Sequence, residues 1–286
     1  MTLKSTWTSC GAAAIATALS LGMTISVAHA GSVTQPGETV GIAAGAPLPP
    51  GVYFVNTFDY GHRDGVDTFS AVDIPVVAWS TPWTLLGARL QFLLATPVIE
   101  VGVPHTNFDV GVYNPLIAGQ LAWDLGNGWG VSYALGAYIG VDTAVSFDST
   151  SLNQRFAASY TANGWNLTAN LIYGIQFDAV TNTLNPDFLN LDLTATKKFG
   201  KWELGPVAFA STDLTRPIPG YQKQSQFAVG GLVGYDFGPV IMQAYVTTDV
   251  AEENYGGHDT RGWFRLIIPV WTPPAPVSRA PLITKG

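Results

Sequence analysis

The stretch Gly130–Asp142 reads GVSYALGAYIGVD, and larger apolar side chains recur at every second position of it. Its odd-numbered residues from Val131 to Val141 are all apolar or aromatic, whereas its even-numbered residues are mostly glycine, alanine or serine. A period of two is the period of a β-strand. A strand with one apolar face and one small or polar face fits the wall of a membrane barrel, because such a wall separates lipid from a lumen.

The same period recurs along most of the chain after Gly51. The clearest further segments are residues 86–94, 165–178, 189–196, 226–237 and 264–270. Weaker segments fill the gaps, at residues 52–59, 68–78, 115–124, 155–162, 203–211 and 240–249. Together these segments give about twelve strands, an even number, as bacterial single-chain barrels have. The predicted fold is therefore all-β, an antiparallel transmembrane β-barrel.

The connections between these segments alternate in length. Short turns are predicted at residues 80–82, 126–128, 163–164, 200–201 and 238–239, where Asn-Gly and similar pairs favour hairpins. Longer loops are predicted near residues 60–67, 98–113, 143–154, 179–187, 212–224 and 250–261. This arrangement is typical of porins, so we expect short periplasmic turns, longer extracellular loops and both termini on the periplasmic side.

The composition supports a membrane protein over a soluble sandwich or soluble barrel, which also alternate. Charged residues make up only 12% of the 286 residues, whereas 47% are hydrophobic. Soluble sheets usually carry more Lys and Glu on their exposed face. After position 30 no stretch approaches ~20 apolar residues, so a chain that crosses the membrane must close into a barrel. The net charge of −7 argues against a nucleic-acid partner, which needs clustered Lys and Arg.

The sequence divides into four regions. Residues 1–30 predict a signal peptide, because Lys4 precedes an apolar run that ends in an A-x-A cleavage site at Ala28–Ala30. The only cysteine, Cys10, lies in this segment. Residues 31–50 are rich in Gly, Ala and Pro and form either a periplasmic lead-in or a plug. Residues 51–271 are the expected barrel, and residues 272–286 are a Pro-rich tail, expected to be disordered.

Three short motifs carry a family resemblance. They are Pro49–Phe54 (PPGVYF), Asn114-Pro115 at the entry to a strand, and Trp263–Trp271 (WFRLIIPVW). Over about residues 36–271 the chain resembles the outer-membrane transporter family associated with the meta-pathway of phenol degradation, which includes sphingosine-induced outer-membrane proteins. The resemblance implies a bacterial outer-membrane barrel that passes small hydrophobic or aromatic compounds. Trp271 would be the terminal aromatic residue that the barrel-assembly machinery reads.

Residues that could carry catalysis are few. Three histidines fall in predicted long loops, each with a carboxylate nearby: His62, His105 and His258. An outer-membrane lipid-modifying enzyme with loop His/Asp residues is therefore one alternative function. The spacings match no metal-ligand motif and no nucleophile motif. We therefore expect no catalytic residue, no metal and no cofactor.

Charges on the inward face are the more informative candidates. A charge that faces lipid at mid-depth costs ~2–4 kcal/mol for Arg, so inward placement is favoured. The predicted lumen-lining residues, with a role in selectivity or in packing, are Arg89, Gln91, Asp73, Asp192, Glu203, Asp236 and Arg265, with Arg155 as a further candidate. Four aromatic residues are predicted either to contact a solute or to anchor loops at the headgroup level: Tyr60, Phe108, Tyr113 and Tyr221.

The function that these features favour is an outer-membrane channel for passive uptake of small hydrophobic or aromatic compounds. Its expected partners are outer-membrane lipid, lipopolysaccharide, the barrel-assembly machinery and the solute itself. A structural barrel with a filled lumen is the second alternative, because about twelve strands give a bore between the filled eight-stranded barrels and the open sixteen-stranded porins.

Overall fold

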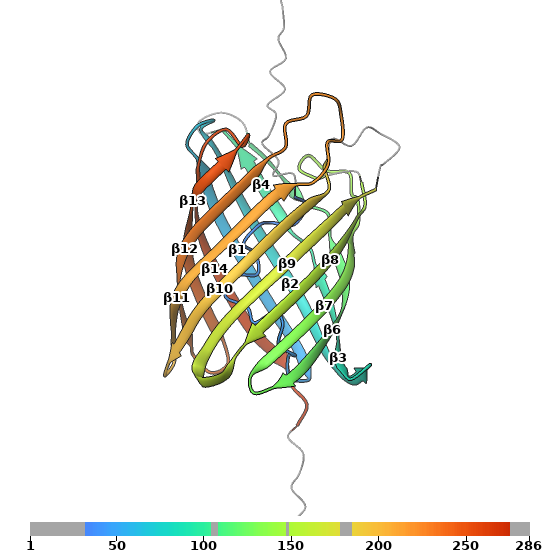
Figure 1. The fold of residues 1–286 in the computed structure, drawn as a ribbon, viewed down its shortest axis with the longest axis vertical. Helices are drawn as coiled ribbons and strands as arrows, with labels where there is room; N and C mark the ends of the chain where they lie inside the picture. The colour runs from blue at the N-terminus through green and yellow to red at the C-terminus, as the bar shows by residue number, and fades with distance from the viewer. Residues whose placement is uncertain (1–31, 104–107, 147–148, 178–184, 275–286) are drawn as a thin grey trace, which may run out of the picture.

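Twelve long antiparallel strands form a closed barrel in the computed structural model, which describes residues 32–103, 108–146, 149–177 and 185–274 (Figure 1). They are β1 (Gly51–Arg63), β2 (Thr68–Leu85), β3 (Ala88–Ala95), β6 (Leu116–Gly126), β7 (Trp129–Tyr138), β8 (Ser151–Tyr160), β9 (Trp165–Gln176), β10 (Phe188–Phe199), β11 (Trp202–Asp213), β12 (Ser225–Asp236), β13 (Ile241–Glu253) and β14 (Asp259–Trp271). β1 pairs with both β2 and β14, which closes the ring. The predicted fold class and the predicted number of barrel strands are confirmed.

The two faces of the wall differ as a membrane barrel requires. Along β9 the polar residues Asn166, Thr168 and Asn170 are buried, whereas Trp165, Leu167 and Leu171 are exposed. The same alternation places large apolar side chains on the outside of most strands. Apolar side chains can contact hydrocarbon there, while the polar ones find partners inside the barrel.

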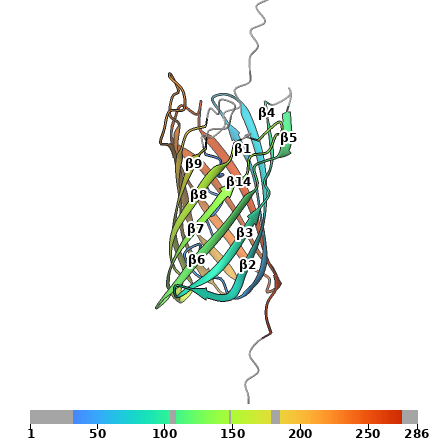
Figure 2. The same cartoon turned by 90° about the vertical axis from the view of Figure 1, so that its right-hand side faces the viewer.

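Two short strands, β4 (Val98–Gly102) and β5 (Phe108–Val112), extend one hairpin beyond the closed wall (Figure 2). β4 pairs with β2 in the same register as β3, so β3 and β4 behave as one strand interrupted at Thr96-Pro97. Pro97 cannot donate to the ladder, although its carbonyl oxygen still accepts from the Tyr113 amide at 2.8 Å. The prediction of a loop over residues 98–113 is therefore wrong, because most of this stretch is the β4–β5 hairpin.

Four of the five predicted short turns are confirmed, and one is wrong. β2 continues through residues 80–82, with an irregular register between Ser80 and Thr84, and ends only at Leu85. The lack of an N–H on Pro82 fits such a bulge. The chain turns instead at Leu86-Gly87, where both residues have positive φ. The predicted loop over 60–67 is shorter than expected, because β1 runs to Arg63 and β2 begins at Thr68.

Residues 32–50, which we call the luminal segment, lie inside the barrel. Val33 belongs to a buried apolar cluster with Ile74 and Phe188, and Val40 belongs to a second cluster with Leu232 and Trp263. The segment is a succession of turns, and no residue of it belongs to a strand of the wall. The sequence left two alternatives for this region, a periplasmic lead-in and a plug. The structure places residues 32–50 in the lumen, where a plug would lie.

The described chain begins inside the barrel, at the first residue of the luminal segment. Ser32 accepts a hydrogen bond from Asn190, which lies near the long-loop end of β10, whereas Gly51 starts β1 at the short-turn end. β1 begins and β14 ends at the short-turn end, as predicted. Residue 32 itself lies toward the long-loop end; both termini lie outside the described residues, so the expectation that they are periplasmic stays a prediction. The only helix in the described residues is a single turn, Ala162–Gly164, and none is long and apolar enough to cross a membrane.

Candidate functional site in the barrel lumen

The Asp192 carboxylate on β10 is the strongest anchor of the luminal segment. It accepts hydrogen bonds from the Gly37 amide at 2.9 Å, the Thr39 amide at 2.9 Å and the Thr39 hydroxyl at 2.6 Å. Asp192 is 2% exposed, so these bonds replace the water that a buried carboxylate would otherwise need. Asp192 thus lines the lumen, as predicted, and the groups that it binds there belong to the protein's own luminal segment.

The Arg265 guanidinium on β14, four strands from β10 along the wall, holds the same segment. It is fully buried and donates to the carbonyl oxygens of Glu38 and Val40. It also donates to Thr57 and to Gln243 and Tyr245 on β13. A planar guanidinium has five N–H donors in a fixed fork, which suits several carbonyl acceptors at once. Arg265 therefore joins the luminal segment to three strands.

An ion pair and a set of side-chain amides and hydroxyls complete the anchoring of the luminal segment. The Glu38 carboxylate lies 2.8 Å from the Arg155 guanidinium, and both side chains are largely buried. The remaining anchors are side chains of the inner wall that bind backbone groups of the segment, among them Asn166 and Gln243 on Gly41, Thr194 on Gly41, Gln120 and Ser132 on Ala44, Ser159 on Gly45 and Asn190 on Thr34. The wall thus contacts the segment along most of its length.

The glycine content of the segment follows from how closely it approaches the wall. A Cβ atom on Gly45 would lie 2.6 Å from the Ser159 backbone nitrogen and 2.8 Å from the Ala158 Cα. Such distances are shorter than van der Waals contact, so any side chain here would push the segment away from β8. The composition that made this region ambiguous in sequence is what allows residues 32–50 to fit in the lumen.

A cavity of about 200 Å³ lies above the luminal segment at the long-loop end. Its apolar wall comes from β2, β4 and the Thr96-Pro97 break: Val72, Ile74, Pro97, Ile99 and Val101. Its polar wall comes mainly from β1, β2, β12 and β14: Arg63, Ser70, Gln226, Asp259 and Arg261. The luminal segment forms its floor through residues that include Val33 and Glu38. The cavity is therefore amphipathic and closed toward the periplasm by the segment.

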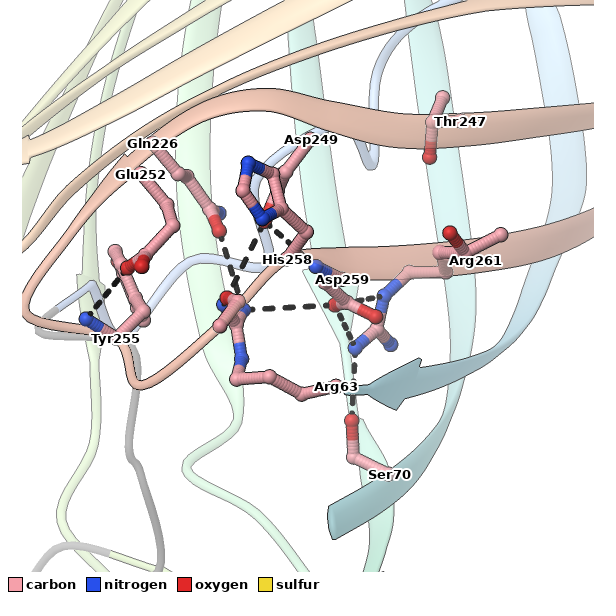
Figure 3. Close-up of polar contacts among 12 residues, drawn as sticks. Arg63, Ser70, Gln226, Thr247, Asp249, Glu252, Tyr255, His258, Asp259 and Arg261 are labelled. Atoms are coloured by element: carbon pink, nitrogen blue, oxygen red, sulfur yellow. Dashed lines mark hydrogen bonds and ion pairs between the residues drawn. The ribbon is translucent and has the colours of Figure 1, made fainter. Parts of the chain in front are cut away.

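The polar wall is part of a cluster in which the charges satisfy one another (Figure 3). This charged cluster consists of Asp59, Arg63, Asp249, Asp259 and Arg261. Arg261 donates to Asp259 at 2.8 Å and also binds Asp59, while Arg63 lies 3.5 Å from Asp249 and 3.7 Å from Asp259. Because both arginines are neutralised by carboxylates, the cluster resembles a structural ion-pair network more than a set of free charges.

The other predicted lumen residues divide between packing and turn formation. Gln91 and Glu203 are buried inward-facing side chains, and Glu203 accepts from Thr196 and from Gln243 at 3.1 Å. Arg89 lies at the short-turn end and donates to the Thr81 carbonyl oxygen at 3.2 Å. Asp236 lies at the same end and accepts from the Gly238 amide at 2.7 Å, which fixes the β12–β13 turn.

Asp73 is not a lumen residue, which corrects the prediction. It pairs across the β1–β2 ladder with Phe58, which is 42% exposed, while its neighbours Val72 and Ile74 are buried. Directly paired residues project from the same face of a sheet. Asp73 therefore faces outward and accepts from the Asn56 amide at 2.7 Å. The prediction took a polar residue of a strand to face the lumen. It fails at Asp73 because the inner face of β2 beside Asp73 is apolar, where Val72 and Ile74 line the cavity.

The four aromatic candidates occupy different places. Tyr60 lies in β1 and Phe108 in β5, and both are exposed. Both were predicted to lie in loops, so that placement is wrong. Tyr113 is only 5% exposed and lines the cavity from inside the barrel. Tyr221 lies in the β11–β12 loop and donates to Asp213 at 2.7 Å. Burial and this hydrogen bond raise the pKa of Tyr221, so the phenol stays protonated and acts as a loop anchor.

The loop histidines form no constellation among the described residues. The His62 imidazole contacts Asp67 at 2.9 Å on the exposed β1–β2 turn. His258 is bound through its backbone amide to Asp64. His105 lies outside the described residues. Within the described ranges no group of His, Cys, Asp and Glu could hold a metal ion.

Sequence reasoning missed several buried or largely buried charges: Asp59, Arg261 and Glu38, together with Asp213 and Asp249. Asp59 and Arg261 share the parity of Thr57 and Arg265, so extending the alternation of β1 and β14 toward the long loops would have found both. They were excluded because those residues were assigned to, or beside, loops. Glu38 carries no comparable signal, because the luminal segment has no repeating geometry.

Comparison with known proteins agrees with this architecture. The family model described as "Putative MetA-pathway of phenol degradation" matches residues 33–266. The crystal structure of an outer membrane channel from Pseudomonas putida F1 is similar, with a TM-score of 0.60 and 13% identity over 82% of this chain and 99% of that chain.

Two lower-scoring structures share the barrel. They are the NanC porin (TM-score 0.47, 11% identity, 75% of this chain and 98% of that one) and the beta domain of the Bordetella autotransporter BrkA (0.49, 13%, 76% and 99%). At these identities the likeness shows the fold alone. Among curated proteins no sequence matches this chain significantly.

Proposed function

Because this bacterial outer-membrane barrel belongs to the family described as "Putative MetA-pathway of phenol degradation", we propose that it is a channel for passive uptake of small hydrophobic or aromatic compounds. The luminal cavity, rather than any catalytic group, is the site of this function. The observation that carries the proposal is the cavity's continuous apolar wall on β2 and β4.

The chemistry of the cavity favours an apolar solute over an ion or a sugar. Burial of apolar surface is favourable by ~25 cal/mol per Å². Val72, Ile74 and Ile99 offer such surface on one side of the cavity. On the other side, Arg63 and Arg261 already bind carboxylates, so they offer little free charge to an ionic solute.

The luminal segment closes the direct path from the cavity to the periplasm. Passage along the barrel axis therefore requires that the segment shift, at least locally. Asp192 and Arg265 hold it through hydrogen bonds that are lost one by one if it moves. The proposal thus predicts low ion conductance in the resting state together with uptake of an apolar probe.

Uptake by whole cells is the appropriate test, because the lipopolysaccharide leaflet slows hydrophobic compounds that cross ordinary liposomes freely. We expect cells that express the protein to take up an aromatic fluorophore, N-phenyl-1-naphthylamine, faster than cells with an empty vector. The isosteric double change Val72→Thr with Val101→Thr should lower this rate, because it makes the cavity wall polar. Val207→Thr, the same change at a buried site outside the cavity, is the matched control.

A structural barrel with a filled lumen is the second candidate, and the anchoring of the luminal segment favours it. The same assay separates the two functions. Equal uptake with and without the protein, combined with absence of ion current across a planar bilayer, would leave the structural role and refute the channel.

A further inference from the structure

The turn between β10 and β11 gathers positive charge in a chain that is otherwise acidic. Three of the six lysines lie within five residues there, at Lys197, Lys198 and Lys201, although the net charge of the chain is −7. This turn is one of the short turns, so it lies at the periplasmic end of the barrel. The long-loop end, by contrast, carries most of the carboxylates.

These lysines have no carboxylate partner in the part of the chain that the structure describes, where every ion pair involves an arginine or a histidine. The nearest acid in sequence, Glu203, is 5% exposed and binds Thr196 and Gln243 inside the barrel. Lys198 and Lys201 are exposed, although Lys198 pairs across the β10–β11 ladder with Glu203 and the Lys201 carbonyl oxygen accepts from the Asp236 amide. Three positive charges this close in sequence, none of them in an ion pair among the described residues, repel one another, so a bound anion would relieve them.

Aromatic side chains flank this turn on the outer wall, the face to which Lys197 belongs, whereas Lys198 shares the inner face of Glu203. The Lys197 ammonium lies 4.7 Å from the centre of the Trp165 ring, in a cation–π contact. Phe199 and Trp202 flank the turn and are 58% and 52% exposed. Aromatic rings of this kind lie at the level of lipid headgroups, with acyl chains on one side and water on the other. The lysines are therefore at the depth where phosphate groups lie.

We propose that this turn binds the headgroup of an anionic glycerophospholipid of the periplasmic leaflet. The phosphodiester would accept hydrogen bonds from Lys197 and Lys201, and the acyl chains would lie against Trp165 and Trp202. Lys198, on the inner face of the rim beside Glu203, would add positive potential at the same level. A headgroup without an amine, such as a phosphoglycerol, fits better than a zwitterionic one, because the site offers cations and its nearest ladder carboxylate, Glu203, is buried. This inference is independent of the proposed transport function.

The other short turns provide a comparison within the same molecule. The β6–β7 turn carries Asp124 and no lysine, and Asp124 accepts from the Gly126 amide at 2.8 Å. The β12–β13 turn is built in the same way with Asp236. Among the described residues, lysine is thus confined to one sector of this rim, while Arg89 at the same end is paired with the buried Ala122 and binds the Thr81 carbonyl oxygen; this is expected of a lipid site and not of a uniform interfacial belt.

The test is native mass spectrometry of the full barrel released from nanodiscs that contain equal amounts of phosphatidylglycerol and phosphatidylcholine. Basic residues near a membrane surface attract anionic lipid. We expect the retained lipid to favour phosphatidylglycerol by about tenfold, which corresponds to about 1.4 kcal/mol. The triple change of Lys197, Lys198 and Lys201 to Gln should abolish the preference, and the triple change to Arg should keep it.

Two controls keep the result specific. Lys223→Gln removes a lysine at the opposite end and should leave the preference unchanged. For the wild type, a rise from 0.1 M to 1 M NaCl shortens the screening length from about 10 Å to about 3 Å and should lower the preference without any substitution.

Equal retention in the wild type and the Gln variant would overturn the proposal. So would a Gln variant that loses bound lipopolysaccharide instead of phospholipid from discs that contain both, because the site would then belong to the other leaflet.

Discussion

Removal of the Asp192 carboxylate should release the luminal segment while leaving the barrel wall intact. The carboxylate accepts three hydrogen bonds from Gly37 and Thr39, at 2.6–2.9 Å. A hydrogen bond to a charged group contributes ~1.5–3 kcal/mol net. In Asp192→Ala, water from the cavity above would replace part of this loss. We therefore expect the segment to be held less tightly by about 3 kcal/mol, which is about a hundredfold in the population of displaced segment.

The assay measures access to position 40. Val40 is fully buried, and the only natural cysteine, Cys10, lies in the predicted signal peptide. In a Val40→Cys background, a maleimide should label the Asp192→Ala protein about a hundred times faster than its parent. Single-channel conductance should rise in parallel, because the segment closes the lumen.

The matched control is Asp236→Ala, which removes an inward carboxylate that binds only the β12–β13 turn. Heat-modifiable migration on gels verifies that each variant still forms the barrel. Unchanged labelling in Asp192→Ala, or an equal rise in the control, would refute the conclusion that Asp192 holds the segment in place.

Three further outcomes follow from side chains in other parts of the barrel. Asp73→Leu should raise the thermal unfolding temperature slightly, since a lipid-facing carboxylate costs free energy at mid-depth; a clear fall would mean that the residue does not face lipid. Arg261→Ala should lower the free energy of unfolding by ~3–5 kcal/mol, because the fully buried Asp59 carboxylate loses its partner, whereas Asp259 keeps Arg63; guanidinium titration measures it, and the exposed Arg216→Ala should change it little. Tyr221→Phe should speed proteolysis in the β11–β12 loop several-fold at unchanged barrel stability, because the hydrogen bond to Asp213 contributes ~1 kcal/mol; equal cleavage rates would contradict its role as an anchor.

The wall of the barrel could be predicted from the sequence because each strand repeats a local rule. Alternation along Gly130–Asp142 and its counterparts located all twelve barrel strands, since lipid on one side fixes which side chains can point outward. The rule fails where the environment changes. Ser80–Pro82 resembles a turn in composition, yet the wall there absorbs a proline as a bulge. Asp73 resembles a lumen residue, yet the inner face beside it is apolar.

The contents of the barrel could not be predicted, because the contacts that place them are not local. Asp192 binds Thr39 across more than 150 positions of sequence, and Arg265 binds Glu38 across more than 220. No periodicity records such contacts, and the luminal segment has no regular structure of its own. Sequence reasoning assigned residues such as Asp192 and Arg265 to the lumen, but it could not identify the luminal segment as the group that they bind.

The luminal segment is held mainly by its backbone: Asp192, Arg265, Asn166 and Ser159 all bind its amides or carbonyl oxygens. Evolution can therefore exchange many of its side chains without loosening it, provided that the residues in closest contact with the wall stay small, as at Gly45. The bore of such a barrel is then a property of a short replaceable insert. Related proteins could acquire different permeabilities by drift in about twenty residues, with the strand number and the scaffold left as they are.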